Sequence, residues 1–251
     1  MSRLIELPAL FIRARVNIIE EEIEKLPVVK HGKHRDISVL RIYYKKNGKC
    51  RHHECPVNSE KGQQLLRLKK RRDALLIRRD QWRSLLTNDI DIHLLDLTKV
   101  HTIFDKRFWE SVHVRSEFES KSTGYRYKDM IMDSRAEMIV AQTLDSLGME
   151  YKYEPQIIIN GEIYYPDFLV YLPEFNRCFF IEFLGKLDKE DYRSRNKFKL
   201  MDYLGYGMVI NKDLLLFGGT ANDMVSADEM TDDIIALIKK YCRMYSVYCE
   251  I

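Results

Sequence analysis

Apolar residues gather into two strand-like runs between Tyr151 and Leu172. This stretch is interrupted once, by Asn160-Gly161, a dipeptide that strongly favours the two-residue turn of a β-hairpin. In such a turn Ile159 pairs with Glu162, and the two strands continue outward as antiparallel partners. The pattern therefore predicts a hairpin over this whole stretch.

A second tight turn is predicted at residues 173–176, before a nearly continuous apolar run from Cys178 to Phe183. Such a run is typical of a strand that is covered on both faces. If the second turn is centred between Glu174 and Phe175, Asp167 pairs with Glu182 on the next strand. Counting residues from the first turn, at Asn160-Gly161, places Glu154 opposite Asp167. Directly opposed side chains share one face of a sheet. A shift of register by one residue would turn Glu182 to the other face.

Three carboxylates in one row across three strands would repel one another. Their pKa values would rise, or a cation would bind between them. Hard oxygen ligands suit Mg²⁺ or Mn²⁺. We therefore expect a metal site that contains Asp167, Glu182 and Glu154.

A helix is predicted to begin at Ser134, because Ser134 and Glu137 form a capping box ahead of an apolar run. It should continue to Leu147 and end at Gly148. Glu137 lies on the inward face of this helix. It could serve as the cap or as a further carboxylate of the site, and the sequence leaves both open.

A second helix is predicted from Asp188 to Leu204. Its periodicity places five residues on one face: Tyr192, Asn196, Lys199, Leu200 and Tyr203. Lys199 then lies at the edge of the buried stripe, whereas Lys197 points elsewhere. Further strands are predicted at Met208–Asn211 and Leu214–Phe217, and a final helix at 227–245.

The N-terminal half predicts strands at Ile37–Tyr44 and Cys50–Cys55, around the turn signal Lys46-Asn47-Gly48. A long helix should follow from Asn58-Ser59 to about Leu86. Between residues 61 and 83 it has nine Lys or Arg against two Asp, a net charge of +7.

This basic helix allows two interpretations. Charge runs of this kind are usually the solvated face of a helix that packs on a neighbour. Clustered cations also bind nucleic acid by releasing its counterions. The residues we expect to contact a phosphate backbone are Lys69, Lys70, Arg71, Arg72, Arg78 and Arg79.

Zinc is a weaker alternative for the N-terminal half. The chain contains His31-Gly-Lys-His34 and Cys50-Arg-His52-His53-Glu-Cys55. Structural zinc sites need two well-spaced ligand pairs, and these spacings match no common zinc finger. We therefore expect these cysteines to be packing residues.

The chain is expected to form two domains. Residues 100–118 predict a helix, and the polar segment from Glu119 to Asp129 is the best candidate for a linker. This places a basic, helix-rich N-terminal domain at 1–125, for binding nucleic acid or a partner. The second domain would be residues 126–251.

Composition limits the class of protein. The chain has 251 residues, of which 45% are hydrophobic and 31% charged, as in ordinary folded proteins. It contains no apolar run of about 18 residues, so no membrane partner is expected. Five scattered cysteines suit reduced thiols, and we expect a cytoplasmic protein.

A strand with Pro166-Asp167, a strand with Glu182 and a flanking helix with Glu137 resemble the PD-(D/E)XK nuclease superfamily, over about residues 131–217. Most members have Glu-X-Lys on the third strand, whereas this chain has Leu184 in place of that lysine. Glu182-Phe-Leu-Gly185 is similar to a subgroup with the pattern Glu-hydrophobic-X-Gly. In that subgroup the lysine lies on the following helix, where this chain has Lys199, and Lys186 and Lys197 are the competing candidates.

This resemblance implies an α/β (α+β) fold, with a restriction-endonuclease-like mixed central sheet flanked by helices. An N-terminal hairpin-plus-helix domain would precede it. The implied activity is metal-dependent endonuclease hydrolysis of phosphodiester bonds in DNA. Asp167 and Glu182 would hold Mg²⁺ or Mn²⁺, with Glu137 or Glu154 beside them, and Lys199 would act on the attacking water or the phosphate.

Two alternatives remain open: an RNA-cleaving nuclease of the same fold, and a nucleic-acid-binding or assembly module whose catalytic site is vestigial. A homodimer or a larger nucleoprotein assembly is compatible with each of these functions.

Overall fold

The computed structural model describes residues 7–46, 49–86, 102–115, 124–220 and 223–248. Contacts divide the chain into two compact units. The smaller unit is Ala9–Ile92, and the larger unit consists of Met1–Pro8 and His93–Ile251. Within the described part of the chain, no helix has the length and apolar character needed to cross a membrane.

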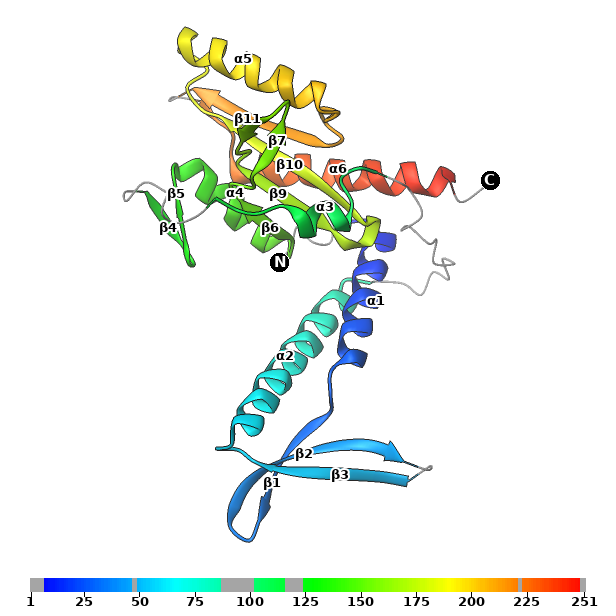
Figure 1. Ribbon diagram of the computed structural model, residues 1–251. Helices are drawn as coiled ribbons and strands as arrows, with labels where there is room; N and C mark the ends of the chain where they lie inside the picture. The colour runs from blue at the N-terminus through cyan, green and yellow to red at the C-terminus, as the bar shows by residue number, and fades with distance from the viewer. Residues whose placement is uncertain (1–6, 47–48, 87–101, 116–123, 221–222, 249–251) are drawn as a thin grey trace. The chain divides into compact units, whose positions relative to one another are not determined.

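The smaller unit combines two helices with a three-stranded antiparallel sheet of order β1-β2-β3. Its elements are α1 (Ala9–Lys25), β1 (Val29–His34), β2 (Ile37–Lys46), β3 (Lys49–Pro56) and α2 (Glu60–Arg83). The two helices lie side by side, as the blue and cyan ribbons of Figure 1 show. Where α2 meets the sheet, the core consists of Val29, Leu40, Cys55 and Leu65.

The predicted strands and long helix of this unit are confirmed, with Ser59 capping α2. The turn at residues 47–48 lies outside the described residues. Strand β1 was not anticipated, because only Val29 of its six residues is buried and alternation is absent. Cys55 is buried, and its Sγ lies 3.3 Å from Ser59 Oγ, as expected of a packing residue.

The larger unit is a mixed α+β fold around a five-stranded sheet of order β12-β11-β10-β9-β6. Its helices are α3 (Lys106–Ser111), α4 (Arg135–Ser146), the 3₁₀ turn η4 (Pro173–Phe175), α5 (Glu190–Gly205) and α6 (Ala227–Tyr248). Its strands are β4 (Tyr125–Tyr127), β5 (Met130–Met132), β6 (Glu150–Tyr153), β7 (Ile157–Ile159), β8 (Glu162–Tyr164), β9 (Phe168–Leu172), β10 (Arg177–Leu184), β11 (Leu214–Thr220) and β12 (Asp223–Met224).

The predicted strand register is confirmed on both sides of β9. Strand β10 pairs with β9 in the expected alignment, with Ile181 opposite Phe168. Strand β6 also keeps the register counted from the first turn, with Tyr153 opposite Phe168. The first turn has Asn160 and Gly161 at φ of 53° and 86°, as a primed hairpin turn requires.

The long hairpin predicted from Tyr151 to Leu172 is divided into two parts. Strands β7 and β8 form a separate two-stranded sheet, whereas β6 and β9 belong to the main sheet. The division occurs at Glu154, whose φ of 46° ends β6, and at Pro155, which cannot donate to a ladder. The pairing of β6 with β9 still has the predicted register, because both strand pairs stay aligned about the turn at Asn160-Gly161.

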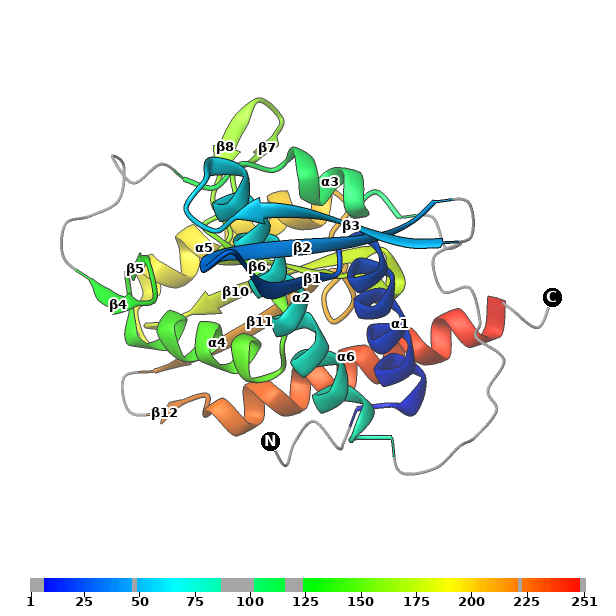
Figure 2. The ribbon, with the colours of Figure 1, turned by 90° about the horizontal axis from the view of Figure 1, so that it is seen from below.

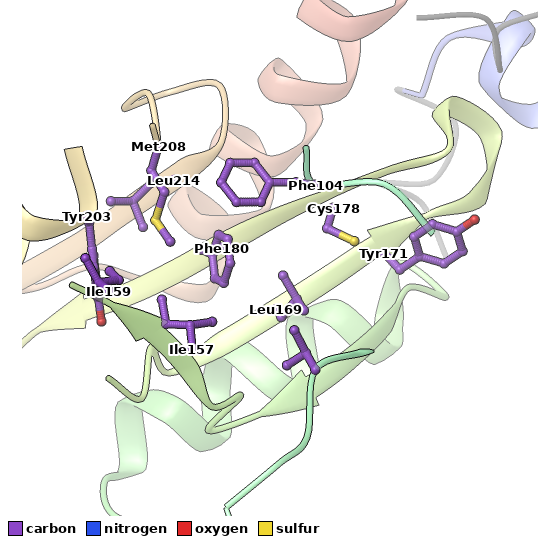
Figure 3. Close-up of a cluster of buried hydrophobic side chains, with 11 residues drawn as sticks. Phe104, Ile157, Ile159, Leu169, Tyr171, Cys178, Phe180, Tyr203, Met208 and Leu214 are labelled. Carbon is purple, nitrogen blue, oxygen red and sulfur yellow. The ribbon is translucent and has the colours of Figure 1, made fainter. Parts of the chain in front are cut away.

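Helices cover both faces of the main sheet, with α4 and α6 on one side and α3, α5 and the β7–β8 hairpin on the other (Figures 1 and 2). All eight residues of β10 are buried, which confirms the strand predicted to be covered on both faces. On the α5 side, Cys178 and Phe180 pack with Leu169, Phe104 and Tyr203 in one apolar cluster (Figure 3).

The boundary between the two units lies at residues 92–93, and not at residue 125 as predicted. Phe104 lies in the predicted N-terminal domain, yet its ring packs on Phe180 at 5.4 Å and its carbonyl accepts a bond from Cys178 N at 2.6 Å. The segment that contains α3 is therefore part of the larger unit. The helix predicted at 100–118 is only six residues long in α3.

Two further predictions need correction. Residues 124–129 of the predicted linker contribute β4, which pairs with β5 across a turn in which Lys128 has a positive φ. The strand predicted at Met208–Asn211 does not form: Ile210 makes only an isolated bridge with Leu214, and a turn follows at 211–213, where Asp213 accepts a bond from Val209 N. Strand β11 and the helices α4, α5 and α6 lie where the sequence predicts them.

Candidate active site

Asp167 and Glu182 come together at the ends of two neighbouring strands. Ile181 is paired with Phe168, so the next step of the ladder brings Asp167 beside Glu182. Phe183 N donates a hydrogen bond of 2.6 Å to Asp167 Oδ2, which fixes this carboxylate against β10. Glu182 follows Cys178 and Phe180 on the α5 side of the sheet, because alternate side chains of a strand share a face.

Lys199 reaches the same place from α5. Its ammonium forms an ion pair with Glu182 Oε1, and its side chain is 27% exposed, compared with 4% for Glu182. The competing lysines, Lys186 and Lys197, are both exposed. The helical phase predicted for Lys199 is therefore confirmed, while its catalytic role stays a prediction.

Tyr203 contacts both partners of this ion pair. Its buried hydroxyl lies 3.5 Å from Glu182 Oε2, and the Lys199 ammonium lies 5.6 Å from the centre of its ring. The Tyr164 ring packs on it at 5.9 Å, and Tyr164 donates a hydrogen bond of 2.7 Å to Asp202. The sequence placed Tyr203 on the correct helix face without assigning it a role, although its position four residues after Lys199 was a usable signal.

Burial dominates the electrostatics of the two carboxylates. It raises the pKa of Asp167 well above the ordinary value, and the nearby charges of Glu182 and Glu137 raise it further. Burial also raises the pKa of Glu182, although Lys199 opposes this shift. Two such groups favour a proton or a cation between them.

Glu137 fulfils the capping interpretation. Ser134 Oγ accepts a hydrogen bond from Glu137 N and donates one of 2.7 Å to its carboxylate, and Asp133 N donates to the same group. Tyr153 adds a further hydrogen bond of 2.7 Å. The charge of Glu137 raises the pKa of Asp167. Its own oxygens are hydrogen-bonded to the start of α4 and to Tyr153 of β6.

Glu154 has the position counted from the sequence, but a different partner. Its backbone N–H donates a bond of 2.9 Å to the carbonyl of Asp167. Its side chain forms an ion pair with Arg115 at 3.2 Å, and burial raises its pKa. Arg115 lies over the Tyr165 ring at 5.0 Å, and no local pattern in the sequence pointed to it.

The site offers two carboxylates to Mg²⁺ or Mn²⁺. Among the residues that the structure describes, no three His, Cys, Asp or Glu side chains gather into a metal-binding group. However, Mg²⁺ is commonly held by one or two carboxylates, while water and substrate phosphate supply the other oxygens. Asp167 and Glu182 provide such a pair.

Comparisons with known proteins assign no family. No protein-family model matches the chain, and no curated protein matches it. The resemblance to the PD-(D/E)XK superfamily therefore depends on the quoted residues alone.

The basic helix α2 has a different environment. Arg72 donates to the carbonyls of Ile23 and Leu26 at the end of α1, the latter at 3.1 Å. Other cations form ion pairs with acidic residues on α1 or α2: Arg71 with Glu22, Arg83 with Glu20, Lys69 with Asp73, and Arg79 with Asp80. At least four of the six expected nucleic-acid contacts are therefore engaged within the unit, while Lys70 is exposed.

Proposed function

We propose that the larger unit is a metal-dependent nuclease that hydrolyses phosphodiester bonds in DNA. The observation that supports this most is the convergence of Asp167, directly before β9, with Glu182 of β10 and Lys199 of α5. Two carboxylates and one ammonium at a single point match the charges of phosphodiester cleavage, which needs a cation and a stabiliser of phosphate charge.

In this proposal, Asp167 and Glu182 hold Mg²⁺ or Mn²⁺. When bound, the ion would polarise the phosphate and lower the pKa of a water molecule. Glu137 adds negative charge near Asp167 and fixes the start of α4, and Glu154 keeps Arg115 close to this edge of the sheet. A restriction-endonuclease-like sheet is part of the proposal.

Lys199 performs a separate task. Its side chain is more exposed than that of Glu182, so its ammonium can bind a phosphate oxygen or hold a water. Tyr203, next to the ion pair, is fully buried within the apolar cluster. A positive charge that is already oriented needs little reorganisation during the reaction.

The test is nicking of a supercoiled plasmid by the full chain, with Mg²⁺, with Mn²⁺ and with a chelator. We expect relaxed and linear products only with a divalent cation. An RNA of matched length, incubated in parallel, distinguishes the RNA-cleaving alternative.

The second candidate is a nucleic-acid-binding module with a vestigial site. Two observations favour it: Lys199 is paired with Glu182, and the Glu137 carboxylate is bonded within the helix cap. These contacts engage side chains that catalysis would require for the cation or the phosphate. DNA binding without cleavage under all three conditions would support this candidate against the nuclease.

A further inference from the structure

The ion pair between Lys199 and Glu182 has a consequence for cation binding. Glu182 Oε1 is bonded to the Lys199 ammonium, and Oε2 lies near the Tyr203 hydroxyl. Asp167 Oδ2 accepts from Phe183 N. A divalent cation that binds both carboxylates would lie close to the ammonium, which carries the same sign of charge and already occupies Glu182 Oε1.

The two partners of this ion pair differ in their freedom to move. The Glu182 side chain is 4% exposed and lies on a fully buried strand, so it is fixed. The Lys199 side chain is 27% exposed, and its four-carbon stem rotates readily. The Tyr203 ring, 5.6 Å from the ammonium, remains a favourable contact after a small displacement.

We propose that Lys199 and a divalent cation compete for Glu182, so that cation binding displaces the more exposed lysine from the buried carboxylate. Lys199 thereby lowers the cation affinity of the free protein. The same displacement presents its charge to a phosphate. This inference rests on the proposed function for the role of the displaced lysine, but the competition itself can be measured without any nucleic acid.

The experiment measures Mn²⁺ binding to the full chain by electron paramagnetic resonance of the free ion. Lys199→Met keeps the length of the side chain and removes the charge. We expect it to bind Mn²⁺ at least about tenfold more tightly than the wild type, because an adjacent ammonium repels a dication strongly in a poorly solvated site. Lys199→Arg keeps the charge and should retain the weak wild-type affinity.

Two controls identify the site. Lys197→Met removes a charge from the same helix at an exposed position, and it should leave the Mn²⁺ affinity unchanged. Combining Glu182→Gln with Lys199→Met should abolish the gain. Circular dichroism spectra and melting temperatures confirm that each variant is folded.

Several outcomes would overturn the proposal. An affinity of Lys199→Met equal to or weaker than that of the wild type would show that the lysine does not compete. Absence of Mn²⁺ binding to both proteins would refute the cation site itself. If Lys199→Met binds Mn²⁺ more tightly but the wild type cleaves no nucleic acid, the competition stands and the nuclease function is rejected. If the wild type cleaves nucleic acid but Lys199→Met does not bind Mn²⁺ more tightly, the nuclease function stands and the competition is rejected.

Discussion

The two charged regions of this chain differ in what the fold does with their charges. Residues 61–83 of α2 have a net charge of +7 on a mostly exposed helix, and many of these cations bond to acidic residues of the neighbouring helix α1 or within α2. In the larger unit, only two carboxylates and one lysine converge, but Glu182 is buried and Asp167 has a strongly raised pKa. Exposed ion pairs contribute little free energy, whereas burial makes each charge expensive unless it has a partner. A few buried charges are therefore the stronger indication of a functional site.

The carboxylates should provide the largest effect. Replacing Asp167 or Glu182 with Ala should reduce Mg²⁺-dependent plasmid cleavage to the level of the chelator control. For Asp167→Ala the fold should remain intact or become slightly more stable, because one of two repelling groups is removed while the ion pair between Glu182 and Lys199 is kept. Cleavage rates and melting temperatures check both parts, and a wild-type rate in either variant would rule out this site.

Lys199→Ala should be next in size. Loss of one oriented charge contact in such a site typically costs about 10²–10³ in rate. Lys186→Ala and Lys197→Ala are matched controls, since both lysines are exposed near the same helix. Single-turnover rates at saturating Mg²⁺ compare the three variants, and a larger loss in Lys186→Ala would move the catalytic lysine to the loop after β10.

Arg72→Ala should affect stability and not catalysis. It removes the donor to the carbonyls of Ile23 and Leu26, so we expect a loss of about 1–3 kcal/mol in the smaller unit. Fluorescence of Trp82 during urea unfolding, in a Trp109→Phe background, reports on this unit. Lys70→Ala is the control and should change the stability by less than about 0.5 kcal/mol, as expected for an exposed position.

The exposed cations of α2 test the remaining nucleic-acid interpretation. Changing Arg67 and Lys70 together to Gln should weaken DNA binding for all sequences alike. The slope of log affinity against log salt should fall by about 0.9 for each lost phosphate contact. Fluorescence anisotropy at several salt concentrations measures both quantities, and an unchanged slope would leave α2 with a purely structural role.

The smallest effect concerns pH. The pKa of Asp167 is raised in the folded protein, so the folded state binds more protons than the unfolded state above the ordinary carboxyl pKa. Its contribution to stability therefore falls as pH rises from that value through the raised folded-state pKa. Asp167→Asn should melt at an increasingly higher temperature than the wild type across this interval. A constant difference between the two melting temperatures would contradict the assigned burial of the charge.

Local patterns determined much of the candidate site. Asn160-Gly161 and the turn at Pro173–Phe175 fix the strand register, because tight turns leave few alignments and each step moves a side chain to the opposite face. The helical period then placed Lys199 on the side of α5 that meets the sheet. The capping box at Ser134 likewise needed only neighbouring residues.

Only the tertiary structure decided which distant partner each charge meets. Arg115 with Glu154 and Arg72 with the end of α1 join segments far apart in the chain. Phe104 belongs to the larger unit for the same kind of reason, since its ring packs on Phe180. The sequence by itself determined the register of β6, β9 and β10 and the positions of α4, α5 and α6, because those depend on short-range sterics and periodicity. Partner choice depends on long-range packing and burial, which no local pattern encodes.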